Sequence, residues 1–577
     1  MMRLAKYTRP YLGWILLAIL LLFAQVNFDL AVPDYLSRMI NIGIQQGAGT
    51  AYILQTGGSM LGLTLLSVLC TVAVVAVSSR VAAGMARDMR SDIFDKVSSF
   101  SNAEFDRFST ASLITRSTND ITQVQLVTMM LIRIVFYAPL MGLGGILHLL
   151  GKDVSILWLI AGAVVFSIGF VVVVILVTTP KFRKIQTLID RLNLVARESL
   201  SGLFVIRAFN RQAFEEKRFD AVNRDLSAVN LFVNRVTMSM MPVMTLVMNG
   251  LGVLIVWVGA RQVAAGTLQV GDIMAAVQYA AQIVMAFLML STIIVILPRA
   301  SVSAGRIADV LETQPVVQAA PTAGPFAEPF QAIIEFDQVS FRYPQAEDDA
   351  LHGISFKALP GQTTALIGPT GAGKSTLINL LLRFYDVTSG TIRVNGADIR
   401  LVTPQALRAQ IGYVPQKGIL FAGTVESNLR FADDHLDEAA LRASIETAQA
   451  AEFVLAQPEG LTLPVAPGGN NLSGGQKQRL SIARALVRKP PVYIFDDSFS
   501  ALDLNTDAAL RRALKPETKG STLILVSQRV SAIQPAEQIL VLDEGRIVGQ
   551  GTHAELMKTN ALYQEIAQSQ LSQAAAV

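Results

Sequence analysis

The sequence predicts an all-α domain of six transmembrane helices with long cytoplasmic helix extensions, followed by an α/β domain. Hydrophobic residues make up 52% of the 577 positions and charged residues only 16%, and the mean hydropathy is +0.45. Long apolar runs fill the first half of the chain, whereas apolar strand-like segments alternate with helical segments in the second half. This asymmetry favours a membrane domain joined to a soluble domain with a parallel sheet over a set of soluble domains.

Six segments are apolar enough to cross a bilayer, given about 20 residues per span. They are centred on residues 11–33, 57–78, 126–150, 155–178, 239–263 and 271–298. The first follows basic residues, but its apolar run is too long for the core of a signal peptide and no small-residue cleavage site follows it. We therefore interpret it as a retained first span.

Basic residues predict the orientation of the spans. They gather before the first segment, between the second and third, and between the fourth and fifth. The short loops at 41–56, 151–154 and 264–270 contain Lys152 as their single basic residue. Because cytoplasmic loops carry an excess of Lys and Arg, both termini are expected in the cytoplasm. The net charge is a modest +4, which makes nucleic-acid binding a poor hypothesis.

The two basic loops are long and show helical periodicity. Residues 80–105 and 181–235 carry apolar positions at three- and four-residue spacing with few breakers, so they are expected to prolong the membrane helices into the cytoplasm. One short interruption falls at residues 108–112 and another at 208–211. Periodicity alone leaves open whether these are ordinary helix turns.

The composition changes to Pro, Ala, Gly and Gln after the sixth segment, which is typical of a linker. We expect a transmembrane domain at 1–311, a linker at 312–332 and a second domain at 333–577. The one cysteine, Cys70, lies in an apolar run, and we expect it to pack without forming an internal disulfide.

The second domain contains a sequence typical of a phosphate-binding loop. Residues 368–375, GPTGAGKS, match the pattern G-x-x-x-x-G-K-[ST], follow an apolar strand at 364–367 and open a helix at 376–382. The glycines let backbone N–H groups turn toward phosphates, and the helix N-terminus adds the positive end of a dipole. Lys374 would hold the β- and γ-phosphates, and the Ser375 hydroxyl would bind Mg²⁺.

A predicted strand that ends in an acidic residue is expected to lie beside this loop. The continuous apolar run at 492–495 predicts a central parallel strand buried on both faces, and it ends at Asp496. That carboxylate is placed to hold Mg²⁺ through its water shell. The apolar run at 522–526 is expected to be the neighbouring strand.

The chain resembles the exporters of the ATP-binding cassette (ABC) family along nearly its whole length. Residues 472–476, LSGGQ, match the family's signature, and 500–503, SALD, match the loop that contacts the opposite cassette. Residues 112–120 and 205–209 are similar to the family's pattern beside its two coupling helices, which favours helix turns at both interruptions. The resemblance implies that ATP lies between the phosphate loop of one cassette and the signature of another, so that a dimer is required.

The resemblance also assigns roles to single residues. Tyr343 matches the aromatic residue that stacks on adenine, and Gln416 matches the glutamine that reaches Mg²⁺. The residues expected to contact nucleotide are Tyr343, Gly368, Thr370, Gly371, Ala372, Gly373, Lys374, Ser375, Thr376, Gln416, Ser473, Gly474, Gly475, Gln476 and Asp503, and those expected at Mg²⁺ are Ser375, Gln416 and Asp496. ATP and Mg²⁺ are the implied cofactors.

Two catalytic positions depart from the family's pattern. Asp497 stands where the family places the Glu that polarises the attacking water, and Gln528 stands where it places a His. Asp is shorter by one methylene, about 1.5 Å, and a general base must lie within hydrogen-bond reach of its proton. Gln can be neither protonated nor a base. Because both changes converge on the γ-phosphate, we interpret them as a degenerate catalytic site and not as drift at tolerant positions. Residues 467–471, PGGNN, also lack the Glu-Arg pair that many exporters have there.

The leading hypothesis is one subunit of an ATP-driven exporter that works as a heterodimer with a second half-transporter. The chain would bind ATP at its own degenerate site and supply an intact signature to the partner's site, in a bacterial inner membrane with its cassette in the cytoplasm. One alternative is a slow homodimeric exporter or lipid flippase. Another is a regulatory membrane protein that ATP gates and that pumps nothing.

The distribution of polar residues and methionines in the spans bears on the cargo. Few charges face the membrane, which favours a small lipophilic or amphiphilic substrate such as a drug or lipid. Asn27 and Asp29 are polar residues in the first span and therefore candidate functional residues. The fifth span is rich in methionines that suit either an adaptable cavity or flexible core packing, namely Met238, Met240, Met241, Met244 and Met248.

Overall fold

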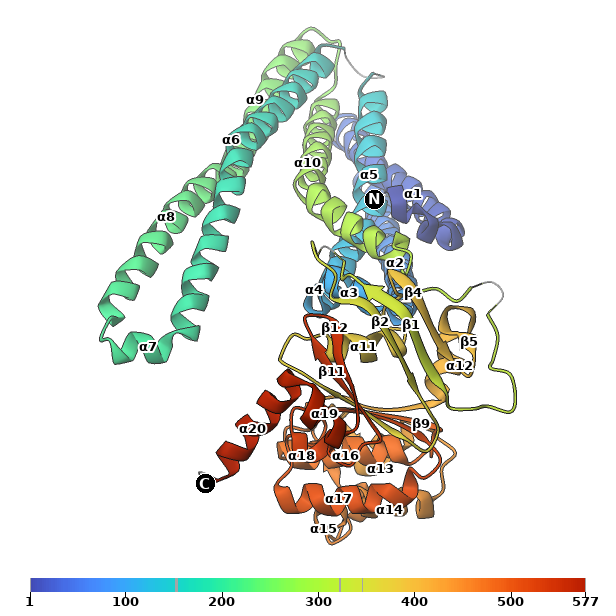
Figure 1. Cartoon of the computed structure of the whole chain (residues 1–577). Helices are drawn as coiled ribbons and strands as arrows, with labels where there is room; N and C mark the ends of the chain where they lie inside the picture. The colour runs from blue at the N-terminus through green and yellow to red at the C-terminus, as the bar shows by residue number, and fades with distance from the viewer. Residues whose placement is uncertain (1, 151–153, 321–322, 345, 576–577) are drawn as a thin grey trace. The chain divides into compact units, whose positions relative to one another are not determined.

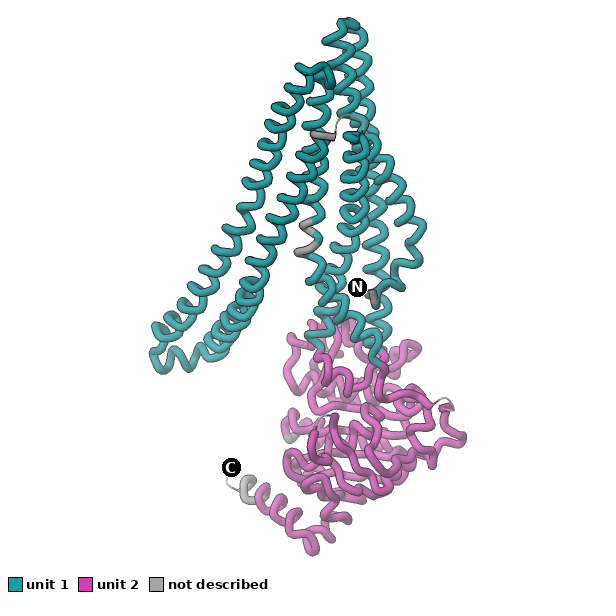
Figure 2. Tube along the Cα trace, turned by 90° about the horizontal axis from the view of Figure 1, so that it is seen from above, with its two compact units in different colours: residues 1–98, 110–313 teal, residues 99–109, 314–577 magenta. Residues whose placement is uncertain are grey.

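The computed structural model describes residues 2–150, 154–320, 323–344 and 346–575. The chain forms two compact units, one of residues 1–98 and 110–313 and the other of residues 99–109 and 314–577 (Figure 2). Lys152, the one basic residue predicted in the short loops, lies outside the described residues.

Unit 1 is all helical, and it confirms the six predicted spans. Six helical segments are long and apolar enough to cross a membrane. The helices are α1 (Leu12–Arg38), α2 (Thr50–Ser98), α4 (Thr110–Thr115), α5 (Ile121–Leu150), α6 (Val154–Ser201), α7 (Leu203–Ala208), α8 (Gln212–Met238), α9 (Met240–Ala264) and α10 (Val270–Glu312). Short 3-10 and π segments extend or join them: η1 (Met2–Tyr11), η2 (Met39–Gln45) and η3 (Arg116–Asp120).

The predicted helix extensions are present. Helix α2 has 49 residues and α6 has 48, which at 1.5 Å per residue is about 70 Å, more than twice the thickness of a hydrocarbon core. Helices α1, α2, α5 and α10 pack on one another, while α6, α8 and α9 form a second arm with α7 at its turn (Figure 1). The chain breaks at Ser109 and Asn210, both with positive φ, inside the two interruptions that the sequence indicates.

Unit 2 contains a six-stranded and a four-stranded sheet. The first has the order β12-β11-β3-β10-β9-β6, and the second has the order β2-β1-β4-β5. Their strands are β1 (Ile334–Phe341), β2 (Leu351–Ala358), β3 (Thr363–Ile367), β4 (Ser389–Val394), β5 (Ala397–Asp398), β6 (Ile411–Val414), β9 (Val492–Asp496), β10 (Thr522–Val526), β11 (Gln538–Asp543) and β12 (Arg546–Gly551). A short hairpin pairs β7 (Gly423–Thr424) with β8 (Pro464–Val465). Strand β10 pairs in parallel with β9, as the sequence predicts, and it also pairs in parallel with β3.

The helices and short helical turns of unit 2 connect and cover these strands (Figure 1). They are α3 (Asn102–Phe108), α11 (Lys374–Leu381), η4 (Ile399–Leu401), α12 (Pro404–Ala409), α13 (Val425–Arg430), α14 (Glu438–Thr447), α15 (Ala451–Val454), η5 (Gly460–Thr462), η6 (Pro467–Gly469), α16 (Gly474–Leu486), α17 (Leu504–Glu517), α18 (Val530–Ile533), α19 (His553–Thr559) and α20 (Ala561–Ala575).

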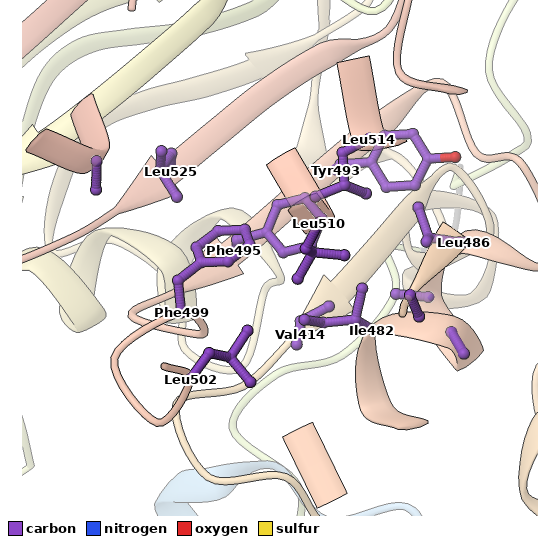
Figure 3. Packing of buried hydrophobic residues seen from close by; sticks show 14 of the residues in the cluster. Val414, Ile482, Leu486, Tyr493, Phe495, Phe499, Leu502, Leu510, Leu514 and Leu525 are labelled. Carbon is purple, nitrogen blue, oxygen red and sulfur yellow. The ribbon is translucent and has the colours of Figure 1, made fainter. Parts of the chain in front are cut away.

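Strand β9 is the centre of the unit 2 core, and every residue in it is buried. Because successive side chains of a strand point to opposite faces, Tyr493 and Phe495 enter one hydrophobic cluster while Val492 and Ile494 enter the other. Figure 3 shows Tyr493 and Phe495 packed among leucines of α16 and α17 and against Val414 of β6. Both faces of the strand are therefore covered, as its continuous apolar sequence predicts.

Helix α3 belongs to unit 2 although it lies between the second and third spans in sequence. The Tyr385 hydroxyl donates a hydrogen bond of 2.6 Å to Asp106 Oδ2. The backbone N–H of Val316 donates to Glu104 Oε1 at 2.9 Å, and the Ala103 side chain lies in a core cluster. Burial, and then the Asp106 carboxylate, raises the pKa of Tyr385, which keeps its hydroxyl protonated as a donor.

We predict that Tyr385→Phe loosens α3 without unfolding the unit. A hydrogen bond to a charged group contributes about 1.5–3 kcal/mol, so amide exchange across residues 102–108 should become about tenfold to a hundredfold faster. Hydrogen exchange followed by mass spectrometry measures this, with Tyr493→Phe on β9 as the matched control. Unchanged exchange in α3 would show that this hydrogen bond does not hold the helix.

Candidate nucleotide-binding site

The phosphate-binding loop joins β3 to α11, and its path requires glycine. Gly368, Gly371 and Gly373 all have positive φ. A Cβ added to Gly368 would lie 2.0 Å from the carbonyl oxygen of Leu542, so the backbone packs too closely there for any side chain. Such a loop can present its N–H groups to an anion at the start of the helix.

Lys374 and Ser375 begin α11 beside the carboxyl end of β9. The buried Lys374 ammonium donates to the carbonyl oxygens of Gly368 and Pro369 at 2.7 and 2.6 Å. Burial lowers its pKa, and the charges of Asp497 and Asp496 oppose that shift. The Ser375 hydroxyl lies 3.5 Å from Asp496 Oδ1. A hydroxyl and a carboxylate are hard oxygen donors, and this pair fits Mg²⁺.

Asp497 lies in the turn that follows β9, in a left-handed conformation with φ 47°. Its buried carboxylate accepts a hydrogen bond of 3.3 Å from Gln416 Nε2, and the backbone N–H of Gln528 also donates to it. The Gln528 carbonyl accepts from Gln570 Nε2 at 2.6 Å. The structure thus brings together Asp497, Gln416 and Gln528, which are far apart in sequence. Burial raises the pKa of both Asp496 and Asp497.

Tyr343, predicted to stack on adenine, lies at the same end of α11. Its hydroxyl is 3.0 Å from Thr376 Oγ1. Its ring meets Phe341 and Tyr385 edge to face, with centroid separations of 4.8 and 5.3 Å. These edge contacts fix the ring's orientation.

The signature residues form a separate group. Ser473 caps α16 and makes a capping box with Gln476, and Asp503 caps α17 through Thr506 N. Gly475 packs near the carbonyl oxygen of Ala501. Across the described ranges, no hydrogen bond or ion pair joins residues 473–476 to residues 368–376. One chain therefore assembles two separate halves of the predicted contact set.

Sequence reasoning missed several polar residues inside the spans. Arg133 on α5 lines a cavity in unit 1, and His148 pairs with Asp34 at 2.9 Å. Arg133 is the one Lys, Arg, Asp or Glu residue in the apolar run at 126–150, and this isolated charge was the signal that could have found it. Of the two that the sequence singles out, Asp29 accepts from Ser67 and Tyr137, whereas Asn27 donates to its own helix backbone at Phe23.

Fold and site together define a membrane protein whose helical domain is fused to a phosphate-loop ATPase. The family model of the ABC transporter transmembrane region matches residues 15–287, and that of the ABC transporter matches residues 351–500. An uncharacterized ABC transporter ATP-binding protein of Mycobacterium tuberculosis is 39% identical over 571 residues, which cover 98% of this chain and 97% of that one.

An ATP-dependent lipid A-core flippase of Aromatoleum aromaticum is 32% identical over 504 residues, 86% of this chain and 82% of its own. The solved structure of a bacterial Atm1-family ABC exporter with ATP bound aligns over 98% of both chains with a TM-score of 0.80 and 26% identity. The chain belongs to the ABC transporter family. It is a half-transporter that couples ATP to transport, and exporters of this family function as dimers.

We predict that Lys374→Met weakens ATP binding about tenfold to a hundredfold, since each charge-assisted hydrogen bond to a phosphate contributes about 1.5–3 kcal/mol. Titration with a fluorescent ATP analogue measures the dissociation constant. The matched control is Lys357→Met, which removes an exposed lysine of β2 that pairs with Glu335 of β1. Equal weakening in both variants would contradict the assignment of Lys374.

The raised pKa of Asp497 predicts an effect of pH on stability. The folded state binds this proton more tightly than the unfolded state does, so the stability contributed by the protonated form is lost as pH rises from the unfolded value of about 3.9 through the folded pKa. Without nucleotide and Mg²⁺, Asp497→Asn should therefore raise the unfolding temperature of the cassette at pH 7.5. The gain should shrink as pH approaches 4. A variant less stable than the wild type at pH 7.5 would contradict this sign.

Proposed function

We propose that this chain is the degenerate-site subunit of a heterodimeric exporter for lipophilic or amphiphilic molecules. Its own phosphate loop binds ATP with little hydrolysis, and its signature completes a competent site on a different half-transporter. The observation that carries the proposal is the pair of substitutions at Asp497 and Gln528 beside an otherwise complete set of nucleotide contacts.

The surroundings of Asp497 support weak hydrolysis. The carboxylate is already engaged by Gln416 and by the backbone of Gln528. Gln528 contacts Asp497 through its backbone N–H. Its side-chain amide can form hydrogen bonds, but it cannot act as an acid or a base.

The separation of the two contact groups supports a dimeric cycle. ATP held by Lys374 and Tyr343 would need a second chain's signature to be enclosed. Conversely, Ser473 and the backbone of Gly474 and Gly475 would close the partner's ATP. In this cycle ATP binding brings the cassettes together and opens the membrane cavity outward, and hydrolysis at the partner's loop resets it. Bound Mg²⁺, held by Ser375, Asp496 and Gln416, would neutralise phosphate charge.

The proposal places the chain in a bacterial inner membrane with both termini in the cytoplasm. It also keeps the domain boundaries expected from the sequence, a transmembrane domain at 1–311, a linker at 312–332 and the cassette at 333–577, as a prediction. In keeping with this orientation, the segments between the second and third spans and between the fourth and fifth spans are rich in basic residues.

Isolation of the tagged chain from its native membranes tests the heterodimer. We expect a second half-transporter in equal amount, with Glu and His at the positions that match Asp497 and Gln528. Recovery of the chain with itself alone would overturn the heterodimer. Asp497 would then be the working base of a slow homodimeric exporter, or the protein would be gated by ATP without pumping.

We further predict that Asp497→Glu combined with Gln528→His raises ATP hydrolysis at this chain's own loop by about 10²–10⁴, the usual contribution of general acid–base catalysis. Phosphate release by a purified complex whose partner carries Gln in place of its own catalytic Glu measures the rate at this loop. Adding Lys374→Met to the pair is the control, and it should return the rate to its starting value. An unchanged rate in the double variant would mean that these two residues do not limit hydrolysis.

A further inference from the structure

Polar residues inside the spans of unit 1 form two layers across three helices. Helix α1 contributes Gln25 and Asp29, α2 contributes Ser67 and Thr71, and α5 contributes Arg133 and Tyr137. Each pair is spaced i,i+4, so both members lie on one helix face. Since α2 runs opposite to α1 and α5, Asp29, Ser67 and Tyr137 fall in one layer and Gln25, Thr71 and Arg133 fall in the other.

In the Asp29 layer, the carboxylate already has hydrogen-bond donors. Ser67 Oγ donates to Asp29 Oδ1 at 2.5 Å, and the Tyr137 hydroxyl donates to Asp29 Oδ2 at 3.3 Å. On α10, Gln282 Nε2 donates to the Asp29 backbone carbonyl at 3.3 Å. Further along α1 and α5, Asp34 pairs with His148 at 2.9 Å. These acids already have hydrogen-bonding partners inside the bundle.

The Arg133 layer is different, because it surrounds a cavity. A cavity of 230 Å³ is lined by Gln25, Thr71, Arg133 and Tyr137, together with the apolar side chains of Leu22, Ile134 and Met289. Four helices, α1, α2, α5 and α10, contribute to this lining. None of the ion pairs among the residues that the structure describes includes Arg133.

Arg133 also lies at membrane depth. It is seven positions beyond residue 126, where the third predicted span begins, or about 10 Å along the helix axis. A guanidinium at that depth is costly unless an anion or water accompanies it, and such residues mark functional sites by default. Its planar donors match the oxygens of a carboxylate or a phosphate.

We propose that this cavity binds the anionic headgroup of a single-chain amphiphile, with Arg133 as the charged contact. Gln25 supplies a further hydrogen-bonding group, and the apolar lining accepts the beginning of the hydrocarbon chain. The Thr71 hydroxyl already donates to the carbonyl oxygen of Ser67, and the Tyr137 hydroxyl already donates to Asp29. The inference rests on the proposed function, because it names the class of cargo for the same transporter. The headgroup chemistry, a cluster of oxygens with a net negative charge, is shared by fatty acids and lysophosphatidic acid.

Direct binding to the purified full-length complex without nucleotide tests the site independently of pumping. The probes are three amphiphiles with the same 16-carbon chain: palmitate, lysophosphatidic acid and zwitterionic lysophosphatidylcholine. We expect at least one anionic probe to bind tenfold or more tightly than the zwitterion. The tighter of the two anionic probes distinguishes a carboxylate from a phosphate cargo.

Variants connect that preference to Arg133. Arg133→Met should abolish the tenfold preference, while Arg133→Lys should retain most of it. The matched control is Arg261→Met on α9, which removes a guanidinium that lies over the Trp257 ring, and this variant should keep the preference. Equal binding of all three probes to the wild type, or an anionic preference that survives Arg133→Met, would overturn the site. If Arg133→Met does not fold, Gln25→Leu should reduce the preference, and an unchanged preference in that variant would also overturn the proposal.

Failure of the proposed function has a different outcome. The protein could bind anionic amphiphiles through Arg133 and yet show no ATP-dependent uptake of the tighter probe into inverted vesicles. That result would support the binding site and contradict the proposed transport function.

Discussion

The parallel pairing of β3, β10, β9 and β6 is the constraint on which the nucleotide site depends. Parallel strands end at one edge of a sheet, so this strand order brings the phosphate loop after β3, the acids after β9, Gln528 after β10 and Gln416 after β6 to the same edge. The burial of β9 on both faces fixes that order, because Tyr493 and Phe495 anchor one core cluster while Val492 and Ile494 anchor the other. Asp496 and Asp497 are therefore held at the end of a rigid strand and partly removed from water.

That position has a chemical consequence. Removing adjacent carboxylates from water disfavours their charged forms, and the pKa of each is raised for this reason. A bound Mg²⁺ would offset the cost at Asp496, whereas Asp497 accepts hydrogen bonds from Gln416 and the Gln528 backbone. The same contacts that stabilise Asp497 in its turn thus oppose its use as a base for the attacking water.

Much of this could be predicted from the sequence because the controlling signals are local. Apolar runs of membrane length predict the six spans, and the glycine spacing of residues 368–373 predicts a phosphate loop with a backbone that only glycine can follow. The continuous apolar sequence of β9 predicts a strand buried on both faces. The helix extensions follow from a three- and four-residue periodicity that continues far beyond the bilayer.

What the sequence could not predict depends on how helices are rotated and packed against one another. Arg133 looks like an isolated charge in its own span, and its relation to Gln25 and Thr71 exists only when α1, α2 and α5 face one cavity. The bond from Tyr385 to Asp106 joins residues 279 positions apart, and no local pattern marks either partner. Likewise, the opposite direction of α2 relative to α1 and α5 places Thr71 beside Gln25 and Arg133 only once the three helices are packed together.

The central claim is that this chain holds ATP without cleaving it, and the fate of the γ-phosphate on the chain tests this most directly. The assembled transporter would be incubated during turnover with a photoreactive ATP labelled on either the α- or the γ-phosphate, and then crosslinked. The account predicts that this chain retains both labels in equal amount while the other subunit retains only the α-label. Loss of the γ-label from this chain at the rate of turnover would contradict it, because Asp497 would then be acting as a competent base.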